Sequence, residues 1–495
     1  MKDKLVKGVA WLGAAKIVVN ILALCSTVVL ARLLTPADFG LVAIVMALLA
    51  IVESVTDLSL ASALIHHQNP TEDHFHTAWS LNLTRGLLIA AVFACAAPYV
   101  ADYYHDSRLT EIMWVIGASI FVTGFNNPKL VVLTRDLIFW QQFVMTVSQK
   151  LAGFVVGVTL AFIFKSYWAI VGGTVASQLV GVIVTYMVVP YRPRFSYRYT
   201  REIWSFSVWL TLGKMINTIN WKFDHLMIGS YLGTKALGFY TVGDNLAAMP
   251  TREAIQPLES TLFPGFKHLV HDKLRLRNAY VSAQGVITAL ALPLGVGFAV
   301  ISHPLVLLLM GEKWLPIVSI IQVLSCIFVL QTIASQVHPL AMALGKTKML
   351  FYRDAVSICI RIPIIVGGMI VGGLMGLIYA RAVTGILALG INMFLVRNLI
   401  DLNVTSQVTS NIRSILSAIM MGVSIFFIQS WWGAEENSFE LGKLLVLLVS
   451  VGFIVYISSH LGFWLLMKKP SGPEVEMILL SKKFVEKIKA FFSKK

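Results

Sequence analysis

Apolar runs of about 20 residues, the length of one membrane-crossing helix, follow one another along almost the whole chain. Short polar connections separate them, and none of these is long enough for a soluble domain. A short segment at 303–312 could form a separate element before the tenth run. We count fourteen runs, near residues 9–33, 38–64, 77–104, 109–131, 140–164, 167–190, 202–231, 236–263, 278–302, 313–343, 350–371, 373–398, 411–432 and 441–467.

Residues 8–44 align with residues 206–242 when the sequence is shifted by 198 positions (209 − 11), so this stretch is repeated. A second match, shifted by 211 positions (361 − 150), carries Asn127-Pro128 onto His338-Pro339. We interpret the chain as two homologous halves, related by an axis along the membrane normal because an even number of spans separates the copies. The matched pairs are Trp11 and Trp209, Leu12 and Leu210, Lys16 and Lys214, Ile21 and Ile219, Leu34 and Leu232, and Gly40 and Gly238, followed in the second match by Arg135 and Lys346, Lys150 and Arg361, and Gly157 and Gly368.

The fold class predicted from these patterns is an all-α polytopic membrane protein of about fourteen transmembrane helices. Two pseudo-symmetric six-helix bundles occupy 1–198 and 199–400, and two additional helices occupy 401–470. The basic tail, 471–495, mixes apolar residues with lysines, so we expect either an interfacial amphipathic helix or a solvated tail. Glycine pairs such as those in 153–157 and 367–376 have the spacing of close helix packing, with a hinge as the alternative.

Composition and charge narrow the function. The chain is 57% hydrophobic and 13% charged, so it is a membrane protein rather than a soluble enzyme with an anchor. Its net charge of +15 does not indicate nucleic acid, because Lys and Arg gather in alternate connections, as the positive-inside rule requires with both termini cytoplasmic. The sequence has no nucleotide-binding loop, no nucleophile elbow and no zinc-protease motif, so we expect no enzyme, cofactor or metal. The polar loop with His66, His67, His74 and His76 is expected to be solvated rather than metal-binding.

Charged residues inside the apolar runs are the candidate functional residues, because such charges are costly in a bilayer and tend to line polar cavities or pair with one another. Salt bridges between helices and a shared cationic cavity both remain open as explanations. We favour the cavity for Lys16, Lys150, Lys214 and Arg361, which the repeats place in equivalent helices. The cations are Lys16, Arg85, Lys150, Lys214, Lys222, Arg252, Arg361 and Arg381, and the acids are Glu53, Asp57, Asp224, Asp244, Glu253 and Glu259.

A mixed polar and aromatic face on the first helix of the second half indicates the kind of ligand. Lys214, Asn217, Trp221 and Asp224 share one side of that helix. A lysine suits a phosphate, and an indole suits stacking on a sugar ring. Because no nucleotide site is present, transport against a gradient needs another source of energy, such as coupling to H⁺ or Na⁺ through a buried acid. The candidates for such coupling are Asp224, Glu53 and Glu253, in that order.

The chain resembles the multidrug/oligosaccharidyl-lipid/polysaccharide (MOP) exporter superfamily. The opening KGVAWLGAAKIVVNILALCSTVVLARLLTPADFGLVAI is similar to the start of Wzx-type polysaccharide flippases. The eighth run and its exit, YTV…NL…MPTRE…PL…LFP over 240–264, resemble the colanic-acid exporter (WzxC-like) branch. The similarity covers most of residues 1–400.

This resemblance implies transport of a polyprenyl-diphosphate-linked oligosaccharide from the inner to the outer leaflet of the bacterial inner membrane. It implies alternating access of two halves around a cationic cavity, contact with membrane lipids, and cooperation with polymerase or ligase machinery. The alternative is a small-molecule or drug:cation antiporter of the same fold, whose cavity would be acidic or apolar. A membrane glycosyltransferase or polymerase is disfavoured, because no large outer loop or catalytic carboxylate motif is present.

Overall fold

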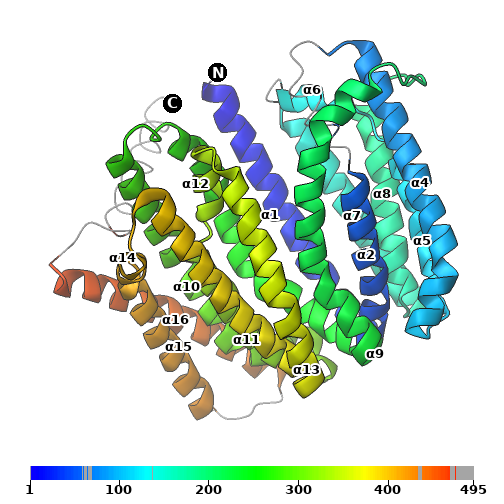
Figure 1. The fold of residues 1–495 in the computed structure, drawn as a ribbon. Coiled ribbons are helices and arrows are strands. Elements are labelled where there is room, and N and C mark those ends of the chain that lie inside the picture. The colour runs from blue at the N-terminus through cyan, green and yellow to red at the C-terminus, as the bar shows by residue number, and fades with distance from the viewer. Residues whose placement is uncertain are drawn as a thin grey trace, which may run out of the picture. The chain divides into compact units, whose positions relative to one another are not determined.

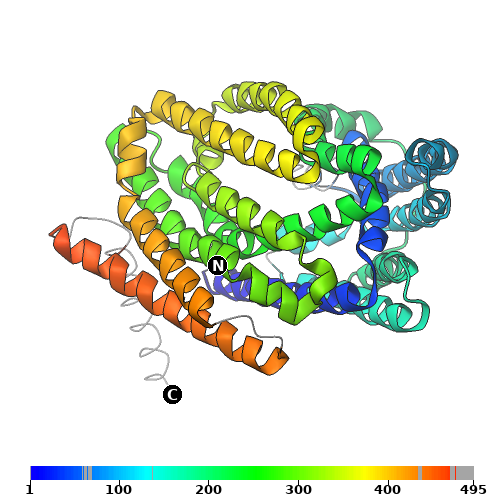
Figure 2. The ribbon, with the colours of Figure 1, turned by 90° about the horizontal axis from the view of Figure 1, so that it is seen from below.

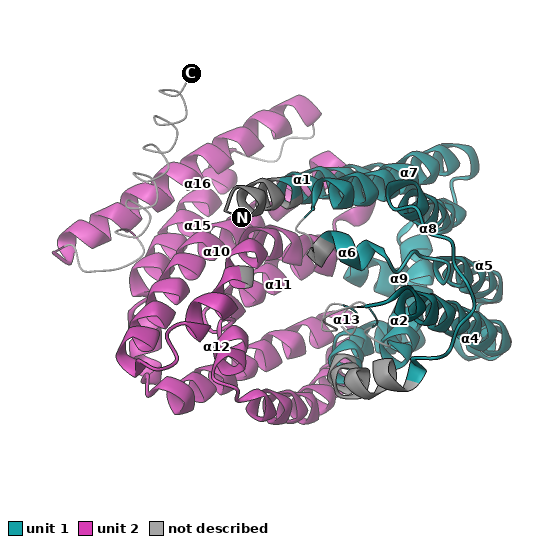
Figure 3. Ribbon diagram, turned by 90° about the horizontal axis from the view of Figure 1, so that it is seen from above, with its two compact units in different colours: residues 1–241 teal, residues 242–495 magenta. Residues whose placement is uncertain are grey.

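The computed structural model describes residues 2–57, 70–135, 138–432 and 437–468, together with Leu60, Leu64 and Glu474. The side chains of residues 2–10, 12, 134–135, 201–214 and 260 are outside this description. The described part is helical apart from its connections (Figure 1). Two compact units divide the chain, residues 1–241 and residues 242–495 (Figure 3). The predicted boundary at 198/199 separates sequence repeats rather than packed units, and it stays a prediction.

The first unit is a set of long helices packed side by side. Helix α1 lies beside α7, and α4 lies beside α5 (Figure 1). Helices α7 and α8 approach closely because Gly153 and Gly173 leave room for each other's backbone, where a Cβ on Gly153 would lie 3.0 Å from the Gly173 carbonyl oxygen. The unit contains α1 (Lys2–Leu33), α2 (Pro36–Thr56), α4 (Glu72–Tyr104), α5 (Arg108–Thr123), α6 (Leu130–Arg135), α7 (Trp140–Phe164), α8 (Trp168–Val188) and the first part of α9 (Thr200–Lys267).

The turn between α1 and α2 follows from a short sequence signal, Thr35-Pro36-Ala37-Asp38. The Thr35 hydroxyl and backbone amide both donate to the Asp38 carboxylate, at 2.6 and 2.9 Å, and the Asp38 amide donates back to the hydroxyl. Pro36 at the first helical position has no amide hydrogen to satisfy. This capping box fixes where α2 begins.

Helix α9 is two helical arms joined at Gly233, whose φ of 81° and ψ of 173° interrupt the helix. The arms correspond to the seventh and eighth apolar runs. Glycine adopts this backbone conformation without the Cβ clash that other residues meet. The second arm turns back toward the start of α2.

The second unit begins in the second arm of α9 and contains the rest of the chain. Helix α13 is also two arms, broken at Gly372 and Gly373, which has a φ of 56°. Helix α10 is continuous through residues 303–310, so these residues do not form the separate short element that the sequence allowed at 303–312, because Pro304 is accommodated inside the helix. The elements are α10 (Lys273–Met310), the 3₁₀ turn η1 (Glu312–Trp314), α11 (Ile317–Thr332), α12 (Val337–Ala343), α13 (Thr347–Ile400), α14 (Val404–Thr409), α15 (Ile412–Trp432) and α16 (Ser438–Leu466).

The two arms of α13 pack against each other through glycines, as the spacing predicts. A Cβ on Gly368 would lie 2.6 Å from the Gly376 carbonyl oxygen, and a Cβ on Gly376 would lie 2.1 Å from that of Gly368. At the C-terminal end of the chain, α15 and α16 lie side by side (Figure 2). These two helices also pack against α10.

The predicted fold class is confirmed. Among the described residues, ten helices are long and apolar enough to cross a membrane by length and composition. Helices α9 and α13 each cover two of the predicted apolar runs, and α5, with 16 residues, covers another. The count of fourteen crossings stays a prediction.

Candidate functional site

Two of the predicted cavity cations, Lys16 and Lys150, lie at similar depth in neighbouring helices of the first unit. Helices α1 and α7 run in the same direction, because Trp11 packs edge-on against Phe143 near their beginnings and Leu30 packs with Ala161 near their ends. Lys16 lies five residues after Trp11, and Lys150 lies seven residues after Phe143. At 1.5 Å of rise per residue, the two lysines differ in height by only about 3 Å.

Lys150 is half-buried and makes no hydrogen bond or ion pair with any residue that the structure describes. Such a cation within a membrane helix is expensive unless water or a ligand solvates it. Lys16 is likewise half-buried. The position of Lys150 supports a site for an anion better than a salt bridge.

Arg85 ties α4 to the end of α2, and its predicted place in the cationic cavity stays a prediction. Its guanidinium donates to the Glu53 backbone carbonyl at 3.0 Å and to the Thr56 hydroxyl at 3.2 Å. The Glu53 carbonyl belongs to the last turn of α2, where carbonyls lack partners in their own helix and where the helix dipole favours a cation. Arg85 therefore caps a helix. The Glu53 side chain is half-buried on the same turn.

The predicted face of α9 divides into an exposed part and a buried part. Asn217 and Trp221 are exposed, whereas Asp224 is 1% exposed. The Tyr240 hydroxyl, from the second arm of α9, donates a hydrogen bond to the Asp224 carboxylate at 2.9 Å. Asp224 is therefore enclosed by the fold-back of α9. The side chain of Lys214, the fourth member of this face, lies outside the described residues.

The predicted cations of the second unit fall into different environments. Arg252 pairs with its neighbour Glu253 at 3.2 Å, and the Arg252 side chain is 58% exposed. This pair is worth little stability because solvent screens it. Arg361 is half-buried on the first arm of α13. Because Arg361 belongs to a different unit from Lys16 and Lys150, a cavity shared by all three stays a prediction.

Arg381 forms the salt bridge that was the alternative to a cavity role. Its guanidinium donates to the Asp244 carboxylate at 2.6 Å, and its side chain is only 7% exposed. The Phe328 ring lies 5.4 Å from the guanidinium carbon and adds a cation–π contact. The pair joins the second arm of α9 to the second arm of α13.

The histidines near the start of α4 have structural partners. His76 Nδ1 lies 2.8 Å from the Tyr191 hydroxyl, and the His74 ring stacks on Tyr199 at 3.8 Å between centroids. The described residues contain no group of three or more metal-ligating side chains. His66 and His67 lie outside the described residues.

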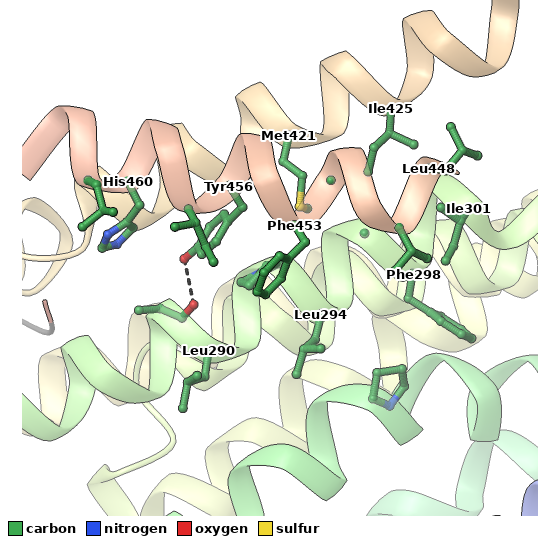
Figure 4. Close-up of a pocket in the computed structure, with 18 of the residues that line it drawn as sticks. Leu290, Leu294, Phe298, Ile301, Met421, Ile425, Leu448, Phe453, Tyr456 and His460 are labelled. Atoms are coloured by element: carbon green, nitrogen blue, oxygen red, sulfur yellow. Dashed lines mark hydrogen bonds between the residues drawn. The ribbon is translucent and has the colours of Figure 1, made fainter. Parts of the chain in front are cut away.

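The second unit contains an apolar cavity of about 620 Å³ between α10, α15 and α16 (Figure 4). Its volume lies within the roughly 300–1,000 Å³ of small-molecule sites. Inside it, the Tyr456 hydroxyl donates a hydrogen bond to the Ala289 carbonyl at 2.7 Å. The walls are apolar side chains, including Leu290, Leu294, Phe298, Met421, Ile425 and Phe453.

One end of this apolar cavity is charged, which the sequence analysis missed. His460 and Glu474 line that end. Arg413, at the start of α15, lies 3.0 Å from the Glu474 carboxylate, and His460 Nδ1 lies 3.4 Å from the same oxygen. The Ser414 hydroxyl bonds to His460 Nε2 at 3.0 Å and fixes the ring. Removing one partner of such a buried ion pair typically costs about 3–5 kcal/mol.

The sequence of this chain is similar to those of proteins that take part in polysaccharide biosynthesis. Residues 29–319 match the model of a family described as polysaccharide biosynthesis proteins. The lipopolysaccharide biosynthesis protein WzxC of Escherichia coli (strain K12) is 23% identical over 383 residues, covering 76% of this chain and 77% of WzxC. The succinoglycan biosynthesis transport protein ExoT of Rhizobium meliloti (strain 1021) is 23% identical over 432 residues, covering 86% of this chain and 87% of ExoT.

Solved structures show the same fold. An inward closed conformation of the lipid II flippase MurJ superposes with a TM-score of 0.75 at 13% identity, covering 91% of this chain and 98% of MurJ. An inward-facing multidrug MATE transporter of the MOP superfamily gives a TM-score of 0.62 at 15% identity, covering 78% of this chain and 94% of the transporter. At these identities the likeness describes architecture only.

Proposed function

Because this chain belongs to the polysaccharide biosynthesis protein family, we propose that it is a flippase for a lipid-linked oligosaccharide. The substrate class is a polyprenyl diphosphate that carries a polysaccharide or lipopolysaccharide precursor. The protein moves it from the inner to the outer leaflet of a bacterial inner membrane, with both of its own termini in the cytoplasm. The role is transport rather than catalysis.

The apolar cavity beside α15 and α16 is the observation that carries this proposal. A lipid-linked glycan needs two unlike environments, one for its hydrocarbon chain and one for its phosphates and sugars. The cavity, walled by residues such as Leu294 and Phe453, suits the hydrocarbon chain. The half-buried Lys16 and Lys150 suit the phosphate charge, and the exposed Trp221 suits stacking on a sugar ring.

A drug:cation antiporter of the same architecture is the alternative. Its ligands are cations, which half-buried lysines would repel. The cationic character of Lys16, Lys150 and Arg361 therefore favours an anionic substrate. Deletion of the gene tests the difference. We expect a lipid-linked glycan to accumulate in the inner leaflet, whereas an antiporter would leave lipid-linked glycans unchanged and raise sensitivity to cationic drugs.

The energy source belongs to the same proposal. The described chain offers a buried carboxylate, Asp224, held by Tyr240 at the fold-back of α9. We assign H⁺ or Na⁺ coupling to Asp224 first, then to Glu53 and Glu253. Polymerase or ligase machinery is the expected partner on the outer side.

A further inference from the structure

The charged end of the apolar cavity holds three ionisable side chains that the proposed transport cycle does not use. Arg413, His460 and Glu474 all lie out of solvent, with 8%, 10% and 3% of their side chains exposed. They come from the start of α15, from α16 and from beyond the end of α16. Their cluster adjoins walls that are otherwise apolar (Figure 4).

This cluster is poorly explained as a clamp between helices. A buried ion pair adds little net stability, because the cost of desolvating both charges offsets their attraction. Apolar packing already holds these helices together, since Met421, Ile425 and Leu448 belong to one buried cluster with Leu292 of α10. A cation at the beginning of a helix is also unfavourable to the helix dipole, so Arg413 does not serve as a cap.

The cluster has the geometry of an anion-binding site in which the Glu474 carboxylate is the bound anion. Arg413 Nη1 and the Nδ1 of His460, whose ring Ser414 orients, both lie within ion-pair distance of the same oxygen, Oε1 of Glu474. An arginine fork binds phosphate and carboxylate oxygens in the same way. If Glu474 leaves, Arg413 stays buried without a counter-charge unless another anion replaces the carboxylate.

We propose that Arg413 and His460 form a binding site for the phosphate of an isoprenoid lipid, and that Glu474 occupies this site when the lipid is absent. The inference rests on the proposed function, because it uses the hydrocarbon chain of the lipid-linked substrate to fill the apolar cavity. A phosphate at Arg413 then lies at the end of a chain that runs past Tyr456 and Phe453, in a second phosphate site that is distinct from the one proposed at Lys16 and Lys150. Glu474 competes with that phosphate and keeps the empty site neutral.

Equilibrium binding of undecaprenyl phosphate to the full-length protein in phosphatidylcholine nanodiscs tests this proposal. Glu474→Gln removes the competing charge, so the affinity for undecaprenyl phosphate should rise by about tenfold if Glu474 occupies the site most of the time. Undecaprenol, which has the same chain and no phosphate, should bind equally to both proteins. Glu440→Gln is the control, because Glu440 pairs with Lys443 at the opposite end of α16 from His460 and should change neither affinity.

Two further variants keep the result interpretable. Arg413→Gln should abolish the preference for undecaprenyl phosphate over undecaprenol. The double variant Arg413→Gln/Glu474→Gln should bind both lipids as Arg413→Gln does. Because it removes both charges of the pair, it replaces the single variant if Arg413→Gln is unstable. Inorganic phosphate should bind at least a hundredfold more weakly than undecaprenyl phosphate, because it cannot fill the cavity. Equal binding of inorganic phosphate would contradict a lipid site.

Unchanged affinity for undecaprenyl phosphate in folded Glu474→Gln would overturn the proposal, as would an equal gain for undecaprenol. Because binding is measured without transport, it separates this inference from the proposed function. If the protein flips its substrate but Glu474→Gln does not change the affinity for undecaprenyl phosphate, only the anion site is refuted. Absence of flipping refutes the proposed function, whatever the binding shows.

Discussion

Gly40 and Gly238 pack backbone to backbone, and each occupies the place of the other in the sequence repeat. A Cβ on Gly40 would lie 1.7 Å from the Thr234 carbonyl oxygen, and a Cβ on Gly238 would lie 1.7 Å from the Pro36 carbonyl oxygen. The shift of 198 positions that relates the two glycines also relates Pro36 to Thr234. The contact is therefore reciprocal, as expected where two equivalent elements meet on a two-fold axis.

Substitution at this contact should destabilise the protein. Gly40→Val and Gly238→Val force α2 and the second arm of α9 apart, and overpacking of this kind typically costs about 1–3 kcal/mol or more. Gly13→Val is the matched control, because a Cβ on Gly13 meets nothing within 4 Å. We expect lower thermal midpoints for the first two variants in fluorescence-detected size-exclusion chromatography. Midpoints equal to that of Gly13→Val would show that the contact is not tight.

Removal of the predicted cavity cations should weaken transport and leave the protein inserted. One charge-assisted contact with the substrate is removed in each of Lys16→Gln, Lys150→Gln and Arg361→Gln. Such a contact is worth about 1.5–3 kcal/mol, so the apparent affinity for the substrate should fall by about tenfold or more. Lys443→Gln is the control, because Lys443 is half-exposed and pairs with Glu440 one turn away. Loss of the three variants from the membrane, rather than loss of export, would favour a purely structural role.

The coupling role of Asp224 can be separated from its packing role. Asp224→Asn removes the carboxylate, whereas Tyr240→Phe removes only the hydrogen bond to it. In proteoliposomes we expect substrate-driven ion flux to disappear in Asp224→Asn and to persist in Tyr240→Phe. Flux in Asp224→Asn equal to that of the unmodified protein would transfer the role to Glu53 or Glu253.

Much of the fold can be predicted from the sequence because membrane helices are local. Run length and turn residues such as Thr35 and Pro36 place most helices within a few residues. The repeat aligns Gly40 with Gly238, but alignment does not show that the two residues touch. Only the fold-back of α9 at Gly233 produces that contact.

The candidate site is less predictable, because its partners are distant in sequence. Helical spacing places Asp224 on a face with Trp221, but Tyr240 closes over Asp224 from the other arm. A charge inside an apolar run also does not reveal whether it caps a neighbouring helix, as Arg85 does. Arg413 and Glu474 are 61 residues apart (474 − 413), and neither lies in a motif that would pair them.

The orientation of the chain gives a prediction that is independent of transport. In a background without cysteine, Cys introduced at Ser107, an exposed residue between α4 and α5, should react with a membrane-impermeant maleimide added to intact cells. Cys at Arg194, an exposed residue before α9, should react only after permeabilisation. The reverse pattern would invert the proposed topology, with the termini outside.

The most direct test of the central claim is a leaflet assay on the purified protein. Proteoliposomes are prepared with a fluorescent polyprenyl-diphosphate-linked oligosaccharide, and a membrane-impermeant lectin or quencher measures how much label reaches the opposite leaflet. We predict rapid transfer with the unmodified protein and transfer near that of empty liposomes with the combined variant Lys16→Gln/Lys150→Gln. Transfer indistinguishable from empty liposomes with the unmodified protein, together with exchange of a cationic drug for protons, would contradict the flippase and establish the antiporter.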